Sequence, residues 1–136
     1  RTAIRVSPCM QLWGIDEGAE GPDLYRYLIG ELDALGLAYL HVAQQGDEAL
    51  LADIRTLWQG TLMLNRAGKP RDEIGSDVAA GLADLESYGQ LVLANPDFVA
   101  RLKAGAPMNA ADRSTFFGGA VKGYTDYPLL REALVA

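Results

Sequence analysis

The chain has 136 residues, of which 49% are hydrophobic and 22% are charged, and this size and composition predict a globular protein with a single domain over residues 1–136. Twelve lysines and arginines against 18 aspartates and glutamates give a formal net charge of −6, which argues against a nucleic acid or an anionic membrane as partner. The sequence has no apolar run near the ~20 residues of a membrane helix, no signal segment and a single cysteine, Cys9, so we expect a cytoplasmic protein.

The first predicted element is a short strand. Residues 3–8 alternate apolar and polar side chains, so Ile4 and Val6 share one face and Arg5 lies on the other. Residues 9–22 form a long loop with several glycines and acidic residues. A loop of this length that follows a strand often lies over a binding site.

Helices and strands then alternate. The helix that Gly36 ends has its apolar residues at Leu24, Leu28, Leu32 and Leu35. Further on come a strand at 38–42, a helix with Leu50, Leu51, Ile54, Leu57 and Trp58, a strand at 61–64, and a helix with Ile74, Val78 and Leu82. Residues 84–98 predict a fourth strand, a turn at Gly89 and a helix start at Asn95-Pro96-Asp97, where Asn95 or Asp97 is the cap and Pro96 suits the first turn.

The order βαβαβαβα implies parallel strands joined by right-handed crossovers. Four such strands form either a small open sheet or half of an eight-stranded TIM barrel, and the pattern alone leaves this choice open. In both cases the ligand-binding groups come directly after the strands.

Several residues near strand ends are candidates for ligand binding. Arg5 requires an anionic or carbonyl partner, which is either a ligand or an acidic side chain of a neighbouring strand. The turns at 65–68 and 89–90 either bind phosphate through backbone N–H groups or are plain tight turns. His41 we interpret as a core-facing histidine with one hydrogen-bond partner. One histidine and one cysteine cannot form an ordinary zinc site, so we predict no metal site.

Six segments match a known pattern in the right order, and they are residues 4–8, 38–42, 94–102, 105–109, 116–119 and 123–128. Together they resemble the old yellow enzyme family of flavin-dependent ene-reductases, and the resemblance covers nearly the whole chain. It implies an α/β fold that is the C-terminal (βα)4 half of a TIM (β/α)8 barrel.

The resemblance also implies a cofactor and a reaction. Members of the family bind FMN non-covalently and pass hydride from NAD(P)H through the flavin to an activated alkene, such as an enone, a maleimide or a nitro compound. It implies that Arg5 lies beside the N1 and O2 edge of the flavin and that Tyr124 borders the substrate. The implied phosphate-binding residues are Asn65, Arg66, Ala67, Gly68, Gly89 and Gln90.

Two departures from the family pattern stand out. Gln90 occupies the position of an arginine that binds the phosphate, and our hypothesis is that Arg66 compensates for the lost charge. The first half of the barrel, which carries the proton-donating tyrosine of the family, has no counterpart here. We therefore assign no catalytic residue.

These inferences lead to one expectation and one alternative. We expect the FMN-binding half of an ene-reductase, with a small-molecule alkene as substrate and, as partner, either the missing N-terminal half-barrel or a second copy of the chain. The alternative is a free-standing half-barrel that associates with itself and binds flavin or phosphate without reductase activity, because a half-barrel exposes strand edges and apolar faces.

Overall fold

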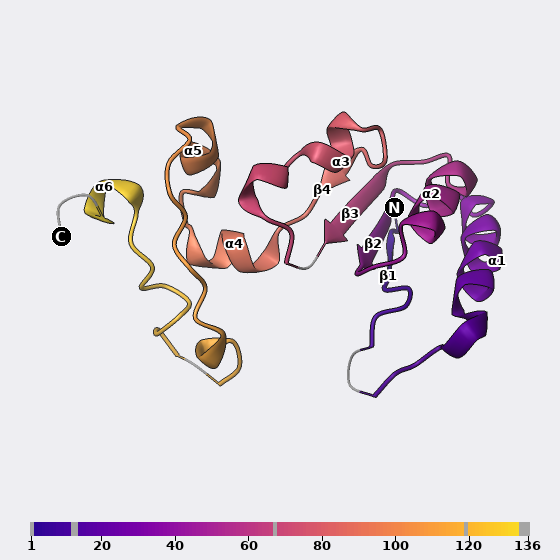
Figure 1. Cartoon of the computed structure of the whole chain (residues 1–136), viewed down its shortest axis with the longest axis horizontal. Coiled ribbons are helices and arrows are strands. Elements are labelled where there is room, and N and C mark those ends of the chain that lie inside the picture. The colour runs from indigo at the N-terminus through magenta and orange to yellow at the C-terminus, as the bar shows by residue number, and fades with distance from the viewer. Residues whose placement is uncertain (1, 12–13, 67, 119, 134–136) are drawn as a thin grey trace. The chain divides into compact units, whose positions relative to one another are not determined.

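Within residues 2–11, 14–66, 68–118 and 120–133, which the computed structural model describes, four parallel strands form one sheet (Figure 1). They are β1 (Ile4–Val6), β2 (Leu40–Gln44), β3 (Leu62–Arg66) and β4 (Leu85–Glu86). Each strand pairs in parallel with the strand that precedes it in the chain, which gives the order β1-β2-β3-β4. The predicted alternation of parallel strands and helices is confirmed.

The described part of the chain divides into two compact units, residues 1–87 and 88–136. The sheet and the helices α1 (Gly21–Asp33), α2 (Glu48–Leu57) and α3 (Ser76–Ala79) belong to the first unit. The second unit has α4 (Gly89–Ala94), α5 (Phe98–Lys103) and α6 (Leu130–Ala133). The single domain expected from the sequence stays a prediction.

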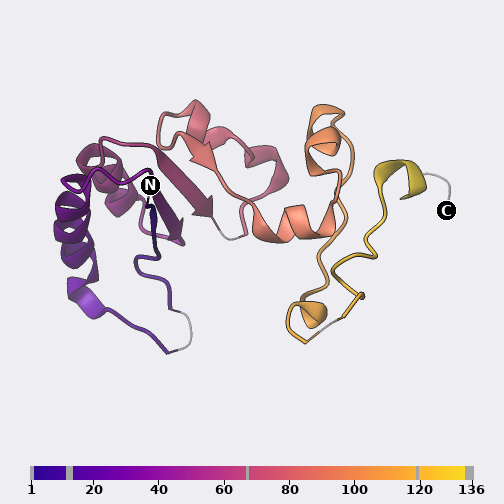
Figure 2. The same ribbon diagram turned by 180° about the vertical axis from the view of Figure 1, so that it is seen from behind.

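Both long helices cover the same face of the sheet (Figures 1 and 2). α1 follows a short 3-10 helix, η1 (Gly18–Glu20), and has Pro22 in its first turn, where the missing N–H of proline costs nothing. Gly36 turns the chain after α1 with a φ of 61°. α2 begins at the cap Asp47, whose carboxylate accepts the Leu50 N–H at 2.9 Å.

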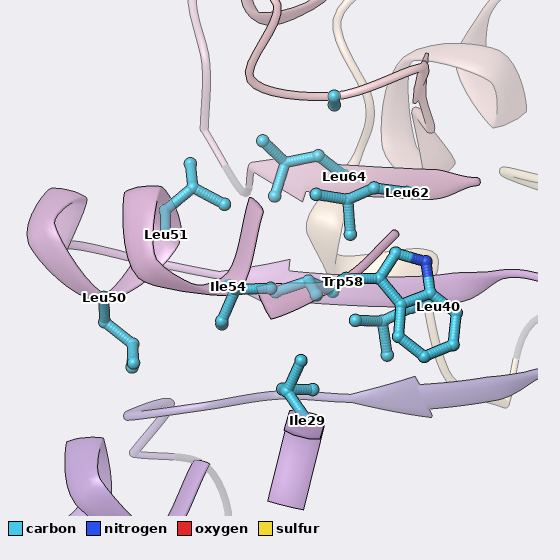
Figure 3. Close-up of a cluster of buried hydrophobic side chains, with 10 residues drawn as sticks. Ile29, Leu40, Leu50, Leu51, Ile54, Trp58, Leu62 and Leu64 are labelled. Carbon is cyan, nitrogen blue, oxygen red and sulfur yellow. The ribbon is translucent and has the colours of Figure 1, made fainter. Parts of the chain in front are cut away.

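The core lies between these helices and the sheet (Figure 3). Its fully buried side chains are Ile29, Leu40, Val42, Leu50, Leu51, Ile54, Trp58, Leu62 and Leu64. Burial of each such side chain contributes about 1.5–3 kcal/mol before entropy is subtracted. Trp58 also donates its indole N–H to the Thr61 carbonyl at 3.0 Å, so its polar group is satisfied.

The expected core face of α1 was wrong in part. Leu24 and Leu35 are 54% and 68% exposed, whereas Ile29 is fully buried and Tyr25 and Leu32 pack beside it. Residues 25, 29 and 32 follow helical spacing as well as the leucines do. Because the leucine stripe has four apolar residues and the buried stripe includes a tyrosine, the pattern pointed to a neighbouring stripe of the same helix.

The third predicted helix is broken into short pieces. A 3-10 turn, η2 (Arg71–Glu73), and α3 replace a helix through Ile74, Val78 and Leu82. Gly75 lies between them at a φ of 85°, which a helical residue does not adopt, and Val78 is 42% exposed.

The second unit begins with a helix where the sequence suggested only a turn. The apolar residues 91–94 belong to α4, which begins directly at Gly89. α5 begins at Phe98, close to the predicted start, but Pro96 precedes its cap Asp97. After α5 the described chain is mostly irregular and has one 3-10 turn, η3 (Arg113–Thr115).

Buried polar side chains hold the second unit together. Arg101 is 1% exposed and donates to Asp97 Oδ1 at 2.6 Å, the Pro107 carbonyl at 2.7 Å and the Pro128 carbonyl at 2.8 Å. Asn95 Oδ1 accepts the Asn109 N–H at 2.7 Å. Neither Asn95 nor Asp97 therefore acts as the side-chain cap that the sequence predicted, because both side chains bind distant segments.

Candidate functional site

One row of side chains crosses the sheet on the face away from the core. Arg5 pairs in register with His41, His41 with Met63, and Met63 with Leu85. Residues in register on parallel strands point to the same face. Arg5 thus lies opposite the core-facing Ile4 and Val6, as expected, and its side chain is exposed.

The prediction that His41 faces the core was wrong, and the predicted hydrogen-bond partner is Ser87. His41 shares the face of Arg5, and its Nε2 lies 2.9 Å from the Ser87 hydroxyl. Burial, with a smaller effect of the Arg5 charge, lowers the pKa of His41. A neutral imidazole is therefore favoured beside the arginine.

Ser87 is the point where three strands converge. Its N–H donates to the Leu64 carbonyl at 2.9 Å, and its carbonyl accepts the Asn65 side-chain amide at 2.7 Å. The hydroxyl of Ser87 is hydrogen-bonded to His41 of β2. The chain after β4 is thereby fixed immediately before the Tyr88-Gly89-Gln90 segment, which belongs to the second unit.

Arg66 lies on the opposite face from Asn65, because successive strand residues alternate. Its guanidinium makes two hydrogen bonds to the Glu48 carboxylate, which raise the pKa of Arg66 further, and Nε lies 3.1 Å from Asp77 Oδ2 without hydrogen-bond geometry. These contacts join β3 to the start of α2 and to α3. Ala67 lies outside the described residues.

A buried cluster of charges follows β3, and the sequence analysis missed it. Lys69 Nζ lies 2.6 Å from Asp77 Oδ2 and 3.6 Å from Glu86 Oε1. Glu86 accepts the N–H groups of Gly75 at 2.7 Å and Asp77 at 2.8 Å. Charged residues in turns are ordinarily solvated, so the sequence offered little reason to expect these side chains to be buried. The one indication was that the charged residues flank two predicted strands.

Two glycines of the candidate phosphate turns have open surroundings. Gly68 has a φ of 79°, and among described residues no atom lies within 4 Å of the position that a Cβ would take at Gly68 or Gly89. Gly89 begins α4, and the Tyr88 side chain does not cap its first turn. Gln90 follows in that turn with an exposed side chain.

The loop after β1 is tied to α1 by Glu17. One carboxylate oxygen accepts the Cys9 N–H at 3.1 Å and the other accepts the Tyr25 hydroxyl at 3.0 Å. Burial and this hydrogen bond raise the pKa of Tyr25 to about 12. Burial raises the pKa of the Cys9 thiol as well, so Cys9 is not an activated nucleophile. Trp13 of the same loop lies outside the described residues.

Tyr124, in the second unit, is 42% exposed and donates its hydroxyl to the Phe116 carbonyl at 2.6 Å.

A shallow depression of about 310 Å³ lies between α1 and α2, and its lining residues are Arg26, Asp53, Thr56 and Leu57. It is on the helices and away from the carboxyl ends of the strands, where ligands of parallel β/α folds bind.

No family model matches the chain. Comparison with known proteins gives sequence relatives that are reductases. The putative 12-oxophytodienoate reductase 12 of Oryza sativa subsp. japonica is 38% identical over 148 residues, covering 96% of this chain and 36% of that protein. The probable flavin mononucleotide-dependent alkene reductase of Leishmania infantum is 36% identical over 136 residues, covering 96% and 36%.

Solved structures agree with the sequence relatives. Morphinone reductase matches with a TM-score of 0.84 and 34% identity, covering 96% of this chain and 37% of that one. Morphinone reductase in complex with tetrahydroNAD matches with a TM-score of 0.83 and 36% identity, covering 94% and 35%. These relatives are all members of the old yellow enzyme family, and this chain resembles part of them over nearly its whole length.

The old yellow enzyme resemblance of the sequence is confirmed, and so is the expected fold class, a parallel β/α unit that matches part of a TIM barrel. The chain spans little more than a third of the length of the curated relatives it matches. No described helix is long and apolar enough to cross a membrane.

Proposed function

We propose that this chain is the FMN-binding part of an ene-reductase that reduces activated alkenes with NAD(P)H. The observation that carries the proposal is the exposed Arg5 on the sheet face away from the core, beside the His41–Ser87 pair. A curated relative is a probable flavin mononucleotide-dependent alkene reductase, and a structural relative is in complex with tetrahydroNAD. When bound, FMN supplies the hydride transfer between the nicotinamide and the alkene.

The residues present fit an anionic cofactor in two respects. Arg5 offers a guanidinium on an open face, which suits the N1 and O2 edge of a flavin, and its positive charge favours the reduced, anionic form. Gly68 and Gly89 leave space where a side chain would stand, so a phosphate can approach the backbone N–H groups there.

The remaining assignments follow from the family. Asn65, Gly68, Gly89 and Gln90 bind the phosphate end, and Ala67 belongs to the same turn. Arg66 contributes its backbone, because its guanidinium already binds Glu48 on the other face of the sheet. Tyr124 borders the substrate. The proton donor comes from outside these 136 residues, and we place the protein in the cytoplasm.

The partner we propose is the N-terminal half of the barrel, on the same or another chain. Among the described strands, β1 and β4 form the two edges of the sheet, and Leu85 on β4 is 47% exposed. These same edges favour the second candidate, a half-barrel that pairs with a second copy and binds flavin without reducing alkenes.

Flavin titration tests the proposal. The purified chain should bind FMN, with one flavin per chain or per dimer by absorbance near 450 nm, and Arg5→Gln should weaken that binding. A protein that remains colourless with excess FMN would overturn both candidates. Oxidation of NADPH with cyclohexenone by the chain alone would contradict the claim that the proton donor lies elsewhere, and mass in solution separates the two partners.

A further inference from the structure

Two cations, Arg66 at the end of β3 and Lys69 after it, meet at one carboxylate. Lys69 Nζ lies 2.6 Å and Arg66 Nε lies 3.1 Å from the same oxygen, Asp77 Oδ2. The Lys69 and Asp77 side chains are 5% and 7% exposed, and that of Arg66 is 21% exposed. Charges so poorly solvated interact more strongly than surface charges do.

Two further carboxylates complete the cluster. Glu48 binds the Arg66 guanidinium, and Glu86 lies 3.6 Å from Lys69. Among these described side chains two positive charges face three negative charges, so the cluster carries a net charge of −1. The turn that the family uses for a phosphate therefore presents cations whose charge is already compensated.

We propose that Asp77 is an internal counter-ion that competes with the phosphate of an anionic ligand for Lys69, while Glu48 keeps the guanidinium of Arg66. The proposal rests on the proposed FMN function and concerns the strength of phosphate binding. A phosphate beside Gly68 gains the charge of Lys69 only by displacing Asp77. With Asp77 in place, a phosphate beside Gly68 is held by backbone N–H groups and gains no cation.

Asp77 is the group to change because the other contacts survive its loss. Glu86 also accepts backbone N–H groups, so its replacement would loosen α3. After Asp77→Asn, Arg66 keeps Glu48 and Lys69 keeps Glu86, while the backbone groups of residue 77 are unchanged. Asp72 is exposed and lies in the adjacent η2, so Asp72→Asn removes the same charge without touching the cluster.

The experiment compares FMN with riboflavin, which lacks the phosphate, by fluorescence titration of the 136-residue chain. Asp77→Asn should tighten FMN binding about fivefold to tenfold, because a charge-assisted contact replaces a neutral one. Riboflavin binding should stay unchanged in this variant, and Asp72→Asn should change neither affinity by more than about twofold.

The outcomes separate this inference from the proposed function. Unchanged FMN affinity in Asp77→Asn, or an equal gain for riboflavin, overturns the inference and leaves the flavin function intact. Failure of every variant to bind either flavin overturns both.

A measurement on the unmodified chain applies even where Asp77→Asn does not fold. Between about 50 and 300 mM salt, FMN affinity should not fall relative to riboflavin affinity, because the compensated cations give the phosphate no net attraction for salt to screen. A steeper loss for FMN would overturn the inference.

Discussion

His41 Nε2 lies 2.9 Å from the Ser87 hydroxyl, so side chains of the second strand and of the segment after the fourth strand are joined across β3. His41 is the single histidine of the sequence. Its titration is therefore directly visible in the pH dependence of stability.

The pKa of His41 is lowered by burial and by Arg5, so on acidification the unfolded chain takes up the proton first. The free energy of unfolding should fall as the pH drops below about 6.5, the ordinary histidine value, and continue to fall until the folded histidine titrates. Urea unfolding between pH 7.5 and 5.5 checks this, with His41→Gln expected to remove the slope. Equal slopes in the two proteins would contradict it.

Arg101 should be essential to the second unit. Arg101→Ala leaves Asp97 and two carbonyls without their buried donor, and we expect a loss of about 3–5 kcal/mol of unfolding free energy. Lys103→Ala, an exposed change in the same helix, should cost less than about 0.5 kcal/mol. Denaturant unfolding and limited proteolysis after residue 88 measure the difference, and similar losses in both variants would contradict a structural role for Arg101.

Gly123 has a positive φ, and the Thr115 side chain lies where a Cβ would stand. A Cβ there would lie 1.8 Å from Thr115 Oγ1, whereas at Gly118, which has a similar positive φ, no described atom lies within 4 Å. Gly118→Ala should cost about 1 kcal/mol from backbone strain alone, and Gly123→Ala should cost about 1–3 kcal/mol more. Thermal unfolding of the two variants isolates the packing contribution, and equal shifts would show that Thr115 moves away freely.

The loop after β1 should loosen when its tie to α1 is removed. Tyr25→Phe deletes the hydroxyl that donates to Glu17 and should cost about 1 kcal/mol at pH 7. Because the pKa of Tyr25 is raised to about 12, the stabilisation should be complete below pH 10 and lost as the pH rises toward 12. Tyr27→Phe, at a 69% exposed tyrosine of the same helix, is the control. Faster proteolysis within residues 9–22 should appear only in Tyr25→Phe.

Gln90→Arg should strengthen FMN binding about tenfold, because the exposed side chain in the first turn of α4 would make a charge-assisted contact to the phosphate. Gln59→Arg adds the same charge at an exposed site in the first unit and should leave the affinity unchanged. Titration with FMN and riboflavin checks that the gain depends on the phosphate. A gain for both ligands would point to general electrostatics.

The sequence predicted the sheet and most of the core because both depend on short-range patterns. Leu50, Leu51, Ile54 and Trp58 are buried as expected, and Gly36 turns the chain after α1. His41 lies between the buried Leu40 and Val42 as Arg5 lies between Ile4 and Val6, so the same alternation indicated the open face, and the core-facing interpretation was wrong. The wrong face of α1 has another cause, because two apolar stripes compete on one helix.

Long-range polar contacts account for the parts of the structure that the sequence did not predict. Asn95, Asp97 and Arg101 belong to the most recognisable segment of the sequence, and their side chains bind residues 109–130, which local capping rules do not anticipate. The Lys69–Asp77–Glu86 cluster depends on the same kind of contact. For the candidate site, the sequence placed Arg5 on the open face, but it gave no indication that Arg66 faces the other way.

The sequential strand order has a consequence for how the protein forms. Each strand pairs with the one made just before it, so the sheet requires no strand that is synthesised much later. The paired residues are nevertheless far apart in sequence, as Ile4 and Leu40 are, and parallel pairings of this kind form more slowly than helical contacts. The first unit can still assemble strand by strand as the nascent chain leaves the ribosome, with the segment after Ser87 added last.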